Sequence, residues 1–323
     1  MKTLTLLRTL TLGLIAGGLI LGAKAAPKKV LVVTVTTGFR HDSIKTAEPV
    51  LAKLGRESGA FTVDYARQPT IQIPQRPNPP RKPNEPPANA DEKATTKYKA
   101  DTARYEAAEK KYQADLAAFD PAKVATAQAE YNQALKESLS KLSPENLKQY
   151  DAVIFANTTG DLPLPDKQGF IDWVKDGHGF VAMHSGSDTF HGFPPYIEML
   201  GGEFRIHHAQ AGIECLVMDP NHPATKPLGE SFCIEQEEVY LIKSFDRTKV
   251  HELLALDKHP NNKKEFGYFP VSWCKDFGKG KVFYTSLGHR DEVWLNSRYQ
   301  KHILGGIKWA LGLEPGDSKP QAN

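Results

Sequence analysis

The chain of 323 residues contains three cysteines, too few for a fold that disulfides hold together. It also lacks an excess of either charge, because 41 lysines and arginines stand against 38 aspartates and glutamates. No basic stripe with interleaved aromatic residues appears, so we expect no nucleic-acid partner. Beyond the first 26 residues, the length suits one large α/β domain or two small ones.

The apolar run at residues 10–21 is shorter than the roughly 20 residues that a membrane-spanning helix needs. Lys2 and Arg8 precede this run, and the small residues Ala23 and Ala25 follow it. A basic start, an apolar middle and a small-residue cleavage site together predict a signal peptide over residues 1–26. We therefore expect an exported protein, periplasmic or secreted, that does not contact the membrane once the signal is removed.

Two of the cysteines lie in segments that resemble strands. Cys215 lies within residues 213–217, and Cys233 opens another extended run. Adjacent antiparallel strands would bring the two thiols within bonding distance. The sequence leaves open whether they form a disulfide, since spacing alone does not determine connectivity. Cys274 is interpreted as an ordinary buried thiol.

Short apolar runs alternate with helical patterns along the chain, which is typical of an α/β fold. Four of the runs stop at clusters of polar and glycine residues. Because the carboxyl ends of parallel strands share one edge of an open sheet, we expect these clusters to converge on one pocket. The four clusters are residues 37–42, 157–161, 184–188 and 286–291.

Residues 69–142 interrupt this pattern. Eight prolines between 69 and 87 exclude a helix or an interior strand there, so we expect a linker or an extended wrap. Farther on, aromatic residues recur every seven positions, which places a single stripe along a helix. Pro121 suits the first turn of a second helix. We predict an inserted helical hairpin that buries its own stripes, with a partner-binding coiled coil as the alternative; the aromatic residues are Tyr98, Tyr105, Tyr112 and Phe119. We expect residues 315–323 to form a disordered tail.

His184 directly follows an apolar strand, where a tight strand-to-turn elbow exposes a side chain. The Gly-x-Ser-x-Gly motif is absent, which disfavours a serine nucleophile at Ser185. Imidazole acts as an acid, a base or a metal ligand near neutral pH. His184, His289 and His41 are therefore the candidate catalytic residues. The alternative for each is a structural histidine bonded to the backbone.

Other polar and aromatic side chains of these clusters are candidates for substrate binding. Arginine offers a planar fork of donors for carboxylates, phosphates or vicinal hydroxyls. Of the four tryptophans, Trp294 is the one that we expect to be exposed near the cleft and to stack on a sugar ring, with packing in the core or at an edge as the alternative. Salt bridges between loops are the alternative for the arginines, and helix capping is the alternative for Asp188. The candidates are Arg40, Thr159, Ser185, Asp188, Glu238, Arg290 and Trp294.

The candidate metal set consists of His207 and His208 with Glu237, or with Glu238 in its place. Two imidazoles and a carboxylate suit a divalent ion of the zinc or nickel type. The tight His-Glu-x-x-His spacing is absent from the chain, so a solvated or structural role for each histidine is the competing interpretation.

Taken together, these segments resemble the ThuA family, named for trehalose utilisation. The resemblance implies a class I glutamine amidotransferase-like, flavodoxin-like fold: a three-layer sandwich with a mostly parallel sheet over residues 27–314, interrupted by 69–142. In that superfamily a cysteine nucleophile usually occupies the elbow, where this chain has His184, so the resemblance implies that the protein is not a glutaminase. The matching segments are 38–44, 159–164, 179–185 with Asp188, 222–225, 237–240, 271–274, 283–289 and 304–310.

The resemblance and the histidine-rich clusters predict an exported protein of carbohydrate metabolism. We expect an enzyme that acts on a disaccharide or a keto-sugar by histidine-mediated proton transfer, aided by a divalent metal. Elimination or isomerisation suits such a pocket better than hydrolysis, which typically needs two carboxylates. The alternative is a non-catalytic sugar-binding module. Residues 69–142 also allow assembly into a homo-oligomer or binding of a partner.

Overall fold

The structure, a computed structural model, describes residues 26–261 and 266–321. All but the last residue of the predicted signal peptide lies outside the described residues. Helices and strands alternate through most of the remaining chain, as the apolar runs predict. The mixed α/β class predicted from the sequence is confirmed.

A sheet of nine strands forms the centre of the described domain, in the order β2-β1-β3-β4-β11-β10-β9-β6-β7. The first five strands in this order run parallel, and the other four are antiparallel to their neighbours. The predicted parallel arrangement therefore describes one side of the sheet only. The strands are β1 (Lys28–Val33), β2 (Phe61–Ala66), β3 (Ala152–Ala156), β4 (Gly179–Met183), β6 (Ala211–Val217), β7 (Ser231–Glu237), β9 (His251–Lys258), β10 (Phe266–Phe277) and β11 (Gly280–Thr285). A separate small sheet pairs β5 (Glu203–His207) with β8 (Tyr240–Lys243).

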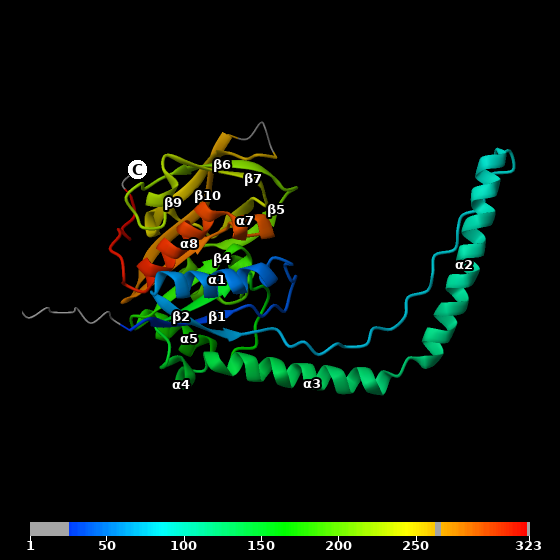
Figure 1. The fold of residues 1–323 in the computed structure, drawn as a ribbon, viewed down its shortest axis with the longest axis horizontal. Helices are drawn as coiled ribbons and strands as arrows, with labels where there is room; N and C mark the ends of the chain where they lie inside the picture. The colour runs from blue at the N-terminus through cyan, green and yellow to red at the C-terminus, as the bar shows by residue number, and fades with distance from the viewer. Residues whose placement is uncertain (1–25, 262–265, 322–323) are drawn as a thin grey trace, which may run out of the picture.

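Helices cover both faces of the large sheet (Figure 1). Side chains along a strand alternate between the faces, so Val30 and Val32 of β1 enter one hydrophobic core while Leu31 and Val33 enter the other. This double burial explains why the parallel strands are continuous apolar runs. The first core includes α1 (Ile44–Ser58), α7 (Asp291–Leu295) and α8 (Ser297–Ala310), and the second includes α4 (Pro144–Leu147), α5 (Lys167–Lys175) and α6 (Pro194–Leu200). The 3-10 helices are η1 (Ser140–Leu142), η2 (His184–Asp188), η3 (Lys226–Leu228) and η4 (Arg247–Lys249).

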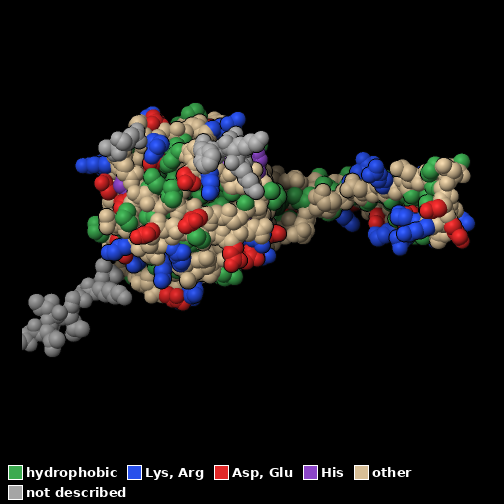
Figure 2. Space-filling model, turned by 90° about the horizontal axis from the view of Figure 1, so that it is seen from above, with side chains coloured by type: hydrophobic (Ala, Val, Ile, Leu, Met, Phe, Trp, Pro, Cys, Tyr) green, Lys and Arg blue, Asp and Glu red, His purple; other side chains and the backbone are tan. Residues whose placement is uncertain are grey.

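Residues 67–139, here called the arm, project from the domain (Figures 1 and 2), and lysine and arginine side chains gather toward its outer end. Both predicted helices form in the arm, as α2 (Glu92–Ala118) and α3 (Pro121–Leu139). They meet at a bend and do not fold back on each other (Figure 1). Helix α2 has no buried residue, and α3 buries only Leu135 and Leu139. The prediction of a hairpin that buries its own stripes is therefore wrong.

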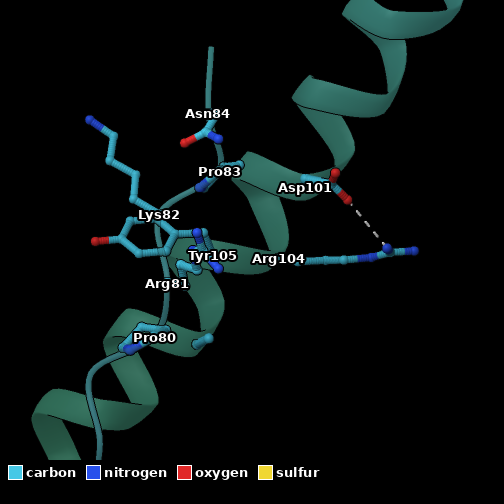
Figure 3. A pocket seen from close by; sticks show the side chains of 9 residues that line it. Pro80, Arg81, Lys82, Pro83, Asn84, Asp101, Arg104 and Tyr105 are labelled. Atoms are coloured by element: carbon cyan, nitrogen blue, oxygen red, sulfur yellow. Dashed lines mark hydrogen bonds and ion pairs between the residues drawn. The ribbon is translucent and has the colours of Figure 1, made fainter. Parts of the chain in front are cut away.

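The aromatic stripe of α2 meets the proline-rich segment instead. Prolines recur at every third residue from 74 to 86, which is the repeat of a polyproline II helix. Pro80 and Pro83 line a groove of about 420 Å³ together with Tyr105 and Ala108. Figure 3 shows the Tyr105 ring beside this proline stretch. The seven-residue aromatic stripe of α2 thus packs against the three-residue proline repeat of the same arm. Every helix of the described residues is too short or too polar to cross a membrane.

The cysteines of β6 and β7 lie on adjacent antiparallel strands, but their register prevents a disulfide. Cys215 pairs with Phe232, and Cys233 pairs with Glu214. Because successive residues of a strand point to opposite faces, Cys215 is buried while Cys233 is exposed. Both thiols are free, as is that of Cys274. The candidate Cys215–Cys233 bridge is therefore wrong.

The C-terminal tail packs along β9 as far as residue 321. The Lys319 carbonyl oxygen lies 2.7 Å from Nδ1 of His251, and the Gln321 side-chain oxygen accepts a hydrogen bond from the Glu252 backbone N–H at 3.2 Å. The prediction of a disordered tail is thus wrong for its described part. Composition did not reveal these two contacts, because each of them involves a backbone atom.

Candidate functional site

Three histidines from distant parts of the chain meet at the carboxyl edge of the parallel strands. His41 lies between β1 and α1, His184 begins the 3-10 helix after β4, and His289 follows β11. Glu238, between β7 and β8, joins them. One nitrogen or oxygen from each of these four residues lies within 4.8 Å of all the others. The predicted convergence of the strand ends therefore unites the three candidate catalytic histidines and one candidate substrate-binding residue.

The separations within this four-residue group match a metal coordination shell. Nε2 of His184 lies 3.2 Å from Nε2 of His41, 3.3 Å from Nδ1 of His289 and 3.7 Å from Oε2 of Glu238. Nδ1 of His289 lies 3.2 Å from Oε2 of Glu238. Bonds of about 2.0–2.1 Å to a tetrahedral zinc ion place neighbouring ligand atoms roughly 3.3 Å apart. The four residues are therefore spaced as ligands of one divalent ion.

The backbone at His184 is bent into the left-handed region, with φ of 47°. This conformation is rare for a residue other than glycine and is found at functional turns. The Tyr284 hydroxyl donates a hydrogen bond to the His184 carbonyl oxygen at 2.9 Å, which holds the turn. The sharp bend after the buried strand β4 turns the imidazole toward the other histidines. The strand-to-turn elbow predicted from the sequence is present in this form.

Neighbouring groups fix which atoms of the ligand set face the centre. Nδ1 of His184 lies 2.8 Å from the Ser286 carbonyl oxygen, which only accepts, so this nitrogen carries the proton and the lone pair of the ring is on Nε2. Nδ1 of His41 lies 3.2 Å from Oγ of Ser185. Oε1 of Glu238 lies 3.0 Å from Nδ1 of His207. Such outer contacts orient metal ligands and raise their basicity.

Burial keeps two of the imidazoles neutral. It lowers the pKa of His184 well below its ordinary value, and the neighbouring His41 lowers it further. Burial also lowers the pKa of His41 to about 4, with a contribution from His289. Burial opposes protonation of His289 too, but the hydrogen bond and charge of Glu238 raise its pKa overall. Neutral imidazole is the form that binds a metal ion, so the electrostatics of His41 and His184 suit ligation, whereas the raised pKa of His289 opposes it.

Glu237 acts on the backbone of the site instead of joining the ligand set. Its side chain is fully buried, and it accepts hydrogen bonds from the backbone N–H groups of Gly288 at 2.8 Å and His289 at 3.2 Å. Burial raises its pKa to about 7, although these backbone donors oppose the rise. His208 is exposed, with its ring beside that of His259. The predicted set of His207, His208 and Glu237 therefore does not converge on one ion; His207 and Glu237 support the ligands instead.

The sequence matches the ThuA family, described as trehalose utilisation, over residues 97–310, which is more than half of the chain. The chain belongs to the ThuA family. This membership connects it with carbohydrate metabolism and confirms the resemblance inferred from the sequence. A comparison with the curated proteins finds no match.

Two solved ThuA-like structures share the fold over most of both chains. The protein from Bacteroides uniformis is 20% identical with a TM-score of 0.54, and the alignment covers 89% of this chain and 93% of that one. The protein from Parabacteroides merdae is 16% identical with a TM-score of 0.58, and the coverage is 88% and 90%. At this level of identity the likeness shows the ThuA fold alone.

Asp188 ends the same 3-10 helix that His184 begins, and His191 holds the Asp188 carboxylate in place. Nε2 of His191 lies 2.7 Å from Oδ1 of Asp188, and Nδ1 lies 2.6 Å from Oε2 of Glu203. Burial opposes protonation of His191, but both carboxylates raise its pKa overall. His191 therefore bridges two carboxylates at the edge of the site. The sequence pointed to Asp188 but not to His191, in the loop before α6, or to Glu203, on β5.

Several predicted substrate-binding residues of this ThuA-family chain make contacts elsewhere. Arg40 donates to the Thr34 carbonyl oxygen at 2.7 Å. Arg290 pairs with Glu292 and lines a hollow of about 580 Å³ that no member of the four-residue group lines. Thr159 is buried and donates to the Phe39 carbonyl oxygen. These three side chains support loops around the site.

Trp294 is not exposed near the cleft, so this prediction is wrong. Its side chain is fully buried in the core, and its indole N–H donates to the Gly288 carbonyl oxygen at 2.8 Å. Tyr240, which sequence reasoning passed over, places its hydroxyl 2.9 Å from Nε2 of His184. Tyr240 could have been found from its position two residues after Glu238, within a segment that carries the family resemblance.

Proposed function

We propose that this protein is a metal-dependent enzyme of carbohydrate metabolism that rearranges a disaccharide or keto-sugar by proton transfer. Membership of the ThuA family, described as trehalose utilisation, supports the substrate class. The three imidazoles and the carboxylate at the sheet edge support the metal dependence. A divalent first-row ion such as zinc, nickel or manganese suits this mixture of nitrogen and oxygen ligands.

The spacing around Nε2 of His184 carries the proposal. This nitrogen holds a lone pair, because the proton of the ring is on Nδ1. It faces Nε2 of His41, Nδ1 of His289 and Oε2 of Glu238, all within 3.7 Å. Buried acceptor atoms at such distances repel one another unless a proton or a cation lies among them. A metal ion would satisfy all four at once, and it would take the lone pair of Nε2 to which the Tyr240 hydroxyl otherwise donates.

This assignment changes the role of the histidines. The sequence suggested that His41, His184 and His289 transfer protons, whereas we now assign them to metal binding with Glu238. A bound divalent ion would polarise a carbonyl or hydroxyl oxygen of the sugar and make a neighbouring C–H or O–H more acidic. Elimination and isomerisation of a keto-sugar both begin with such a proton loss.

The chain's own groups then move and hold the proton. The Tyr240 hydroxyl brings a donor to the centre, 2.9 Å from Nε2 of His184, and is placed to hydrogen-bond the reacting sugar oxygen. Asp188 is the candidate base, held in place by His191 at 2.7 Å. His191 in turn is held by Glu203, so the pair keeps its orientation as a proton is accepted.

We also propose, from the sequence, that the protein is exported from the cell and that its helices and sheet are layered as in the flavodoxin-like fold.

Elemental analysis and turnover assays test this function. The purified protein should bind about one divalent ion, and the variants His184→Ala and His289→Ala should lose it. Turnover of keto-disaccharides should need the metal and should be abolished by a chelator and by Asp188→Asn. Failure of zinc, manganese, cobalt and nickel to bind in the micromolar range would refute the metal centre. Sugar binding without turnover would leave the alternative, a non-catalytic sugar-binding module.

A further inference from the structure

Phe39 is the most exposed large hydrophobic side chain of the described residues, at 69%. It lies two positions before the metal-site residue His41, and the two rings are 4.9 Å apart in an edge-to-face arrangement. The other large hydrophobic residues that are exposed are aliphatic: Ile206, Leu216, Leu295 and Leu313. An aromatic ring thus stands in solvent beside a buried polar centre.

The loop that carries Phe39 is held firmly. The Thr159 hydroxyl donates to the Phe39 carbonyl oxygen at 2.7 Å, and the Thr37 backbone N–H donates to the Thr159 carbonyl oxygen at 2.9 Å. Gly160 has φ of 79°, and a Cβ there would come within 2.8 Å of the Gly38 backbone nitrogen. The two loops therefore lie in close backbone contact. Their packing fixes the backbone that presents the ring.

An exposed aromatic ring beside polar groups matches the surface of a pyranose. One face of such a sugar presents C–H groups, which carry partial positive charge and pack on the negative face of an aromatic ring. Its edge carries hydroxyls, which polar groups and metal ions bind. Ligand sites generally combine apolar surface with a few polar groups in this way. An acyclic polyol has the hydroxyls without a rigid apolar face.

We propose that Phe39 is a stacking platform for a pyranose ring whose hydroxyl edge faces the histidine group. The class of ligand rests on the proposed function, whereas the platform itself rests on the exposure of Phe39 and its contact with His41. It takes the role that the sequence assigned to Trp294, which is buried. Phe39 would thereby select cyclic sugars over acyclic ones.

Titration calorimetry on the zinc-loaded full chain tests the platform, with trehalose, glucose and the acyclic sorbitol as probes. We expect Phe39→Ala to weaken trehalose and glucose binding about tenfold, a loss of about 1.4 kcal/mol, and to leave sorbitol binding unchanged. Phe39→Trp should bind both cyclic sugars within about threefold of the original chain. Leu295→Ala, which removes a similarly exposed side chain at the end of α7, should change neither.

Zinc content measured on the same samples separates this proposal from the proposed function. Phe39→Ala should keep its full zinc content, because the side chain supplies no ligand atom. Unchanged trehalose binding in Phe39→Ala would overturn the platform, as would failure of the original chain to bind either cyclic sugar at tens of millimolar. Phe39-dependent binding of trehalose and glucose, together with no turnover of keto-disaccharides, would support the platform and refute the enzymatic proposal alone.

Discussion

Replacing Ser185 by alanine should weaken metal binding while leaving the fold intact. Oγ of Ser185 is buried and lies 3.2 Å from Nδ1 of His41, on the side of the ring opposite the metal-facing Nε2. The substitution removes one oxygen atom and opens little space. Nδ1 of His41 then loses the partner that orients its ring.

The size of the effect follows from mass action. At a free zinc concentration 100 times the dissociation constant, bound metal adds about 2.7 kcal/mol to the free energy of unfolding. Loss of an outer contact to a metal ligand typically lowers affinity about 10- to 100-fold. At the same zinc concentration, Ser185→Ala should therefore gain only about 0.4 to 1.4 kcal/mol from the metal.

Urea unfolding with and without zinc measures this gain, and competition with a coloured chelator gives the dissociation constant. Ser272→Ala is the matched control, because Ser272 is a buried serine of β10 whose hydroxyl donates to the Tyr284 backbone carbonyl oxygen at 2.7 Å and is bonded to no metal-facing ring. Its zinc-dependent gain should equal that of the original chain. Equal gains in Ser185→Ala and the original chain would refute the reasoning, as would an equal loss in both serine variants.

Three further predictions concern the fold. Burial lowers the pKa of His302 to about 4 from 6.5, so the unfolded chain takes up a proton at a higher pH than the folded one. The free energy of unfolding should therefore fall by about 3 kcal/mol as the pH drops from above 6.5 to 4. In urea unfolding of His302→Gln, this decrease should be about 3 kcal/mol smaller. Trp294→Ala should lower the free energy of unfolding by about 3–5 kcal/mol, since it empties a fully buried site; a loss below 1 kcal/mol would contradict the burial. A thiol assay on the unreduced protein should detect Cys233 when folded and Cys215 only after unfolding; detection of neither in the unfolded chain would indicate a bridge between them.

The position of the site along the chain was readable from the sequence. Each parallel strand is a short apolar run that ends in a polar cluster, and this local pattern does not depend on the rest of the fold. Parallel strands aligned in one sheet must bring their carboxyl ends to a common edge. His41, His184 and His289 could therefore be predicted to meet, and their rings are within 5.3 Å of one another, centre to centre.

The role of each residue near that edge was harder to predict. Glu237 and Glu238 are adjacent and equally plausible as ligands, yet the chain turns one carboxylate to backbone N–H groups and the other to the histidines. Trp294 and Phe39 are both aromatic residues close to a site histidine in sequence, yet one is fully buried and the other is exposed. These choices depend on packing partners that come from distant segments.

In the arm too, the local structure was predictable from the sequence and the tertiary contacts were not. The seven-residue aromatic spacing and Pro121 were enough to predict two helices, because helix periodicity is local. The partner of the stripe on α2 was not predictable, because prolines in a three-residue repeat and a second helix both offer an apolar ridge to Tyr105.

The sequence alone determined the strands, the helices and the places where chemistry is concentrated, since hydrogen bonding and apolar periodicity act over a few residues. Tertiary structure alone decided the strand register that separates Cys215 from Cys233, the burial of Trp294, the exposure of Phe39 and the joining of Glu238 to three histidines. Each of these depends on contacts between segments far apart in the chain, and such contacts leave no periodic trace in the sequence.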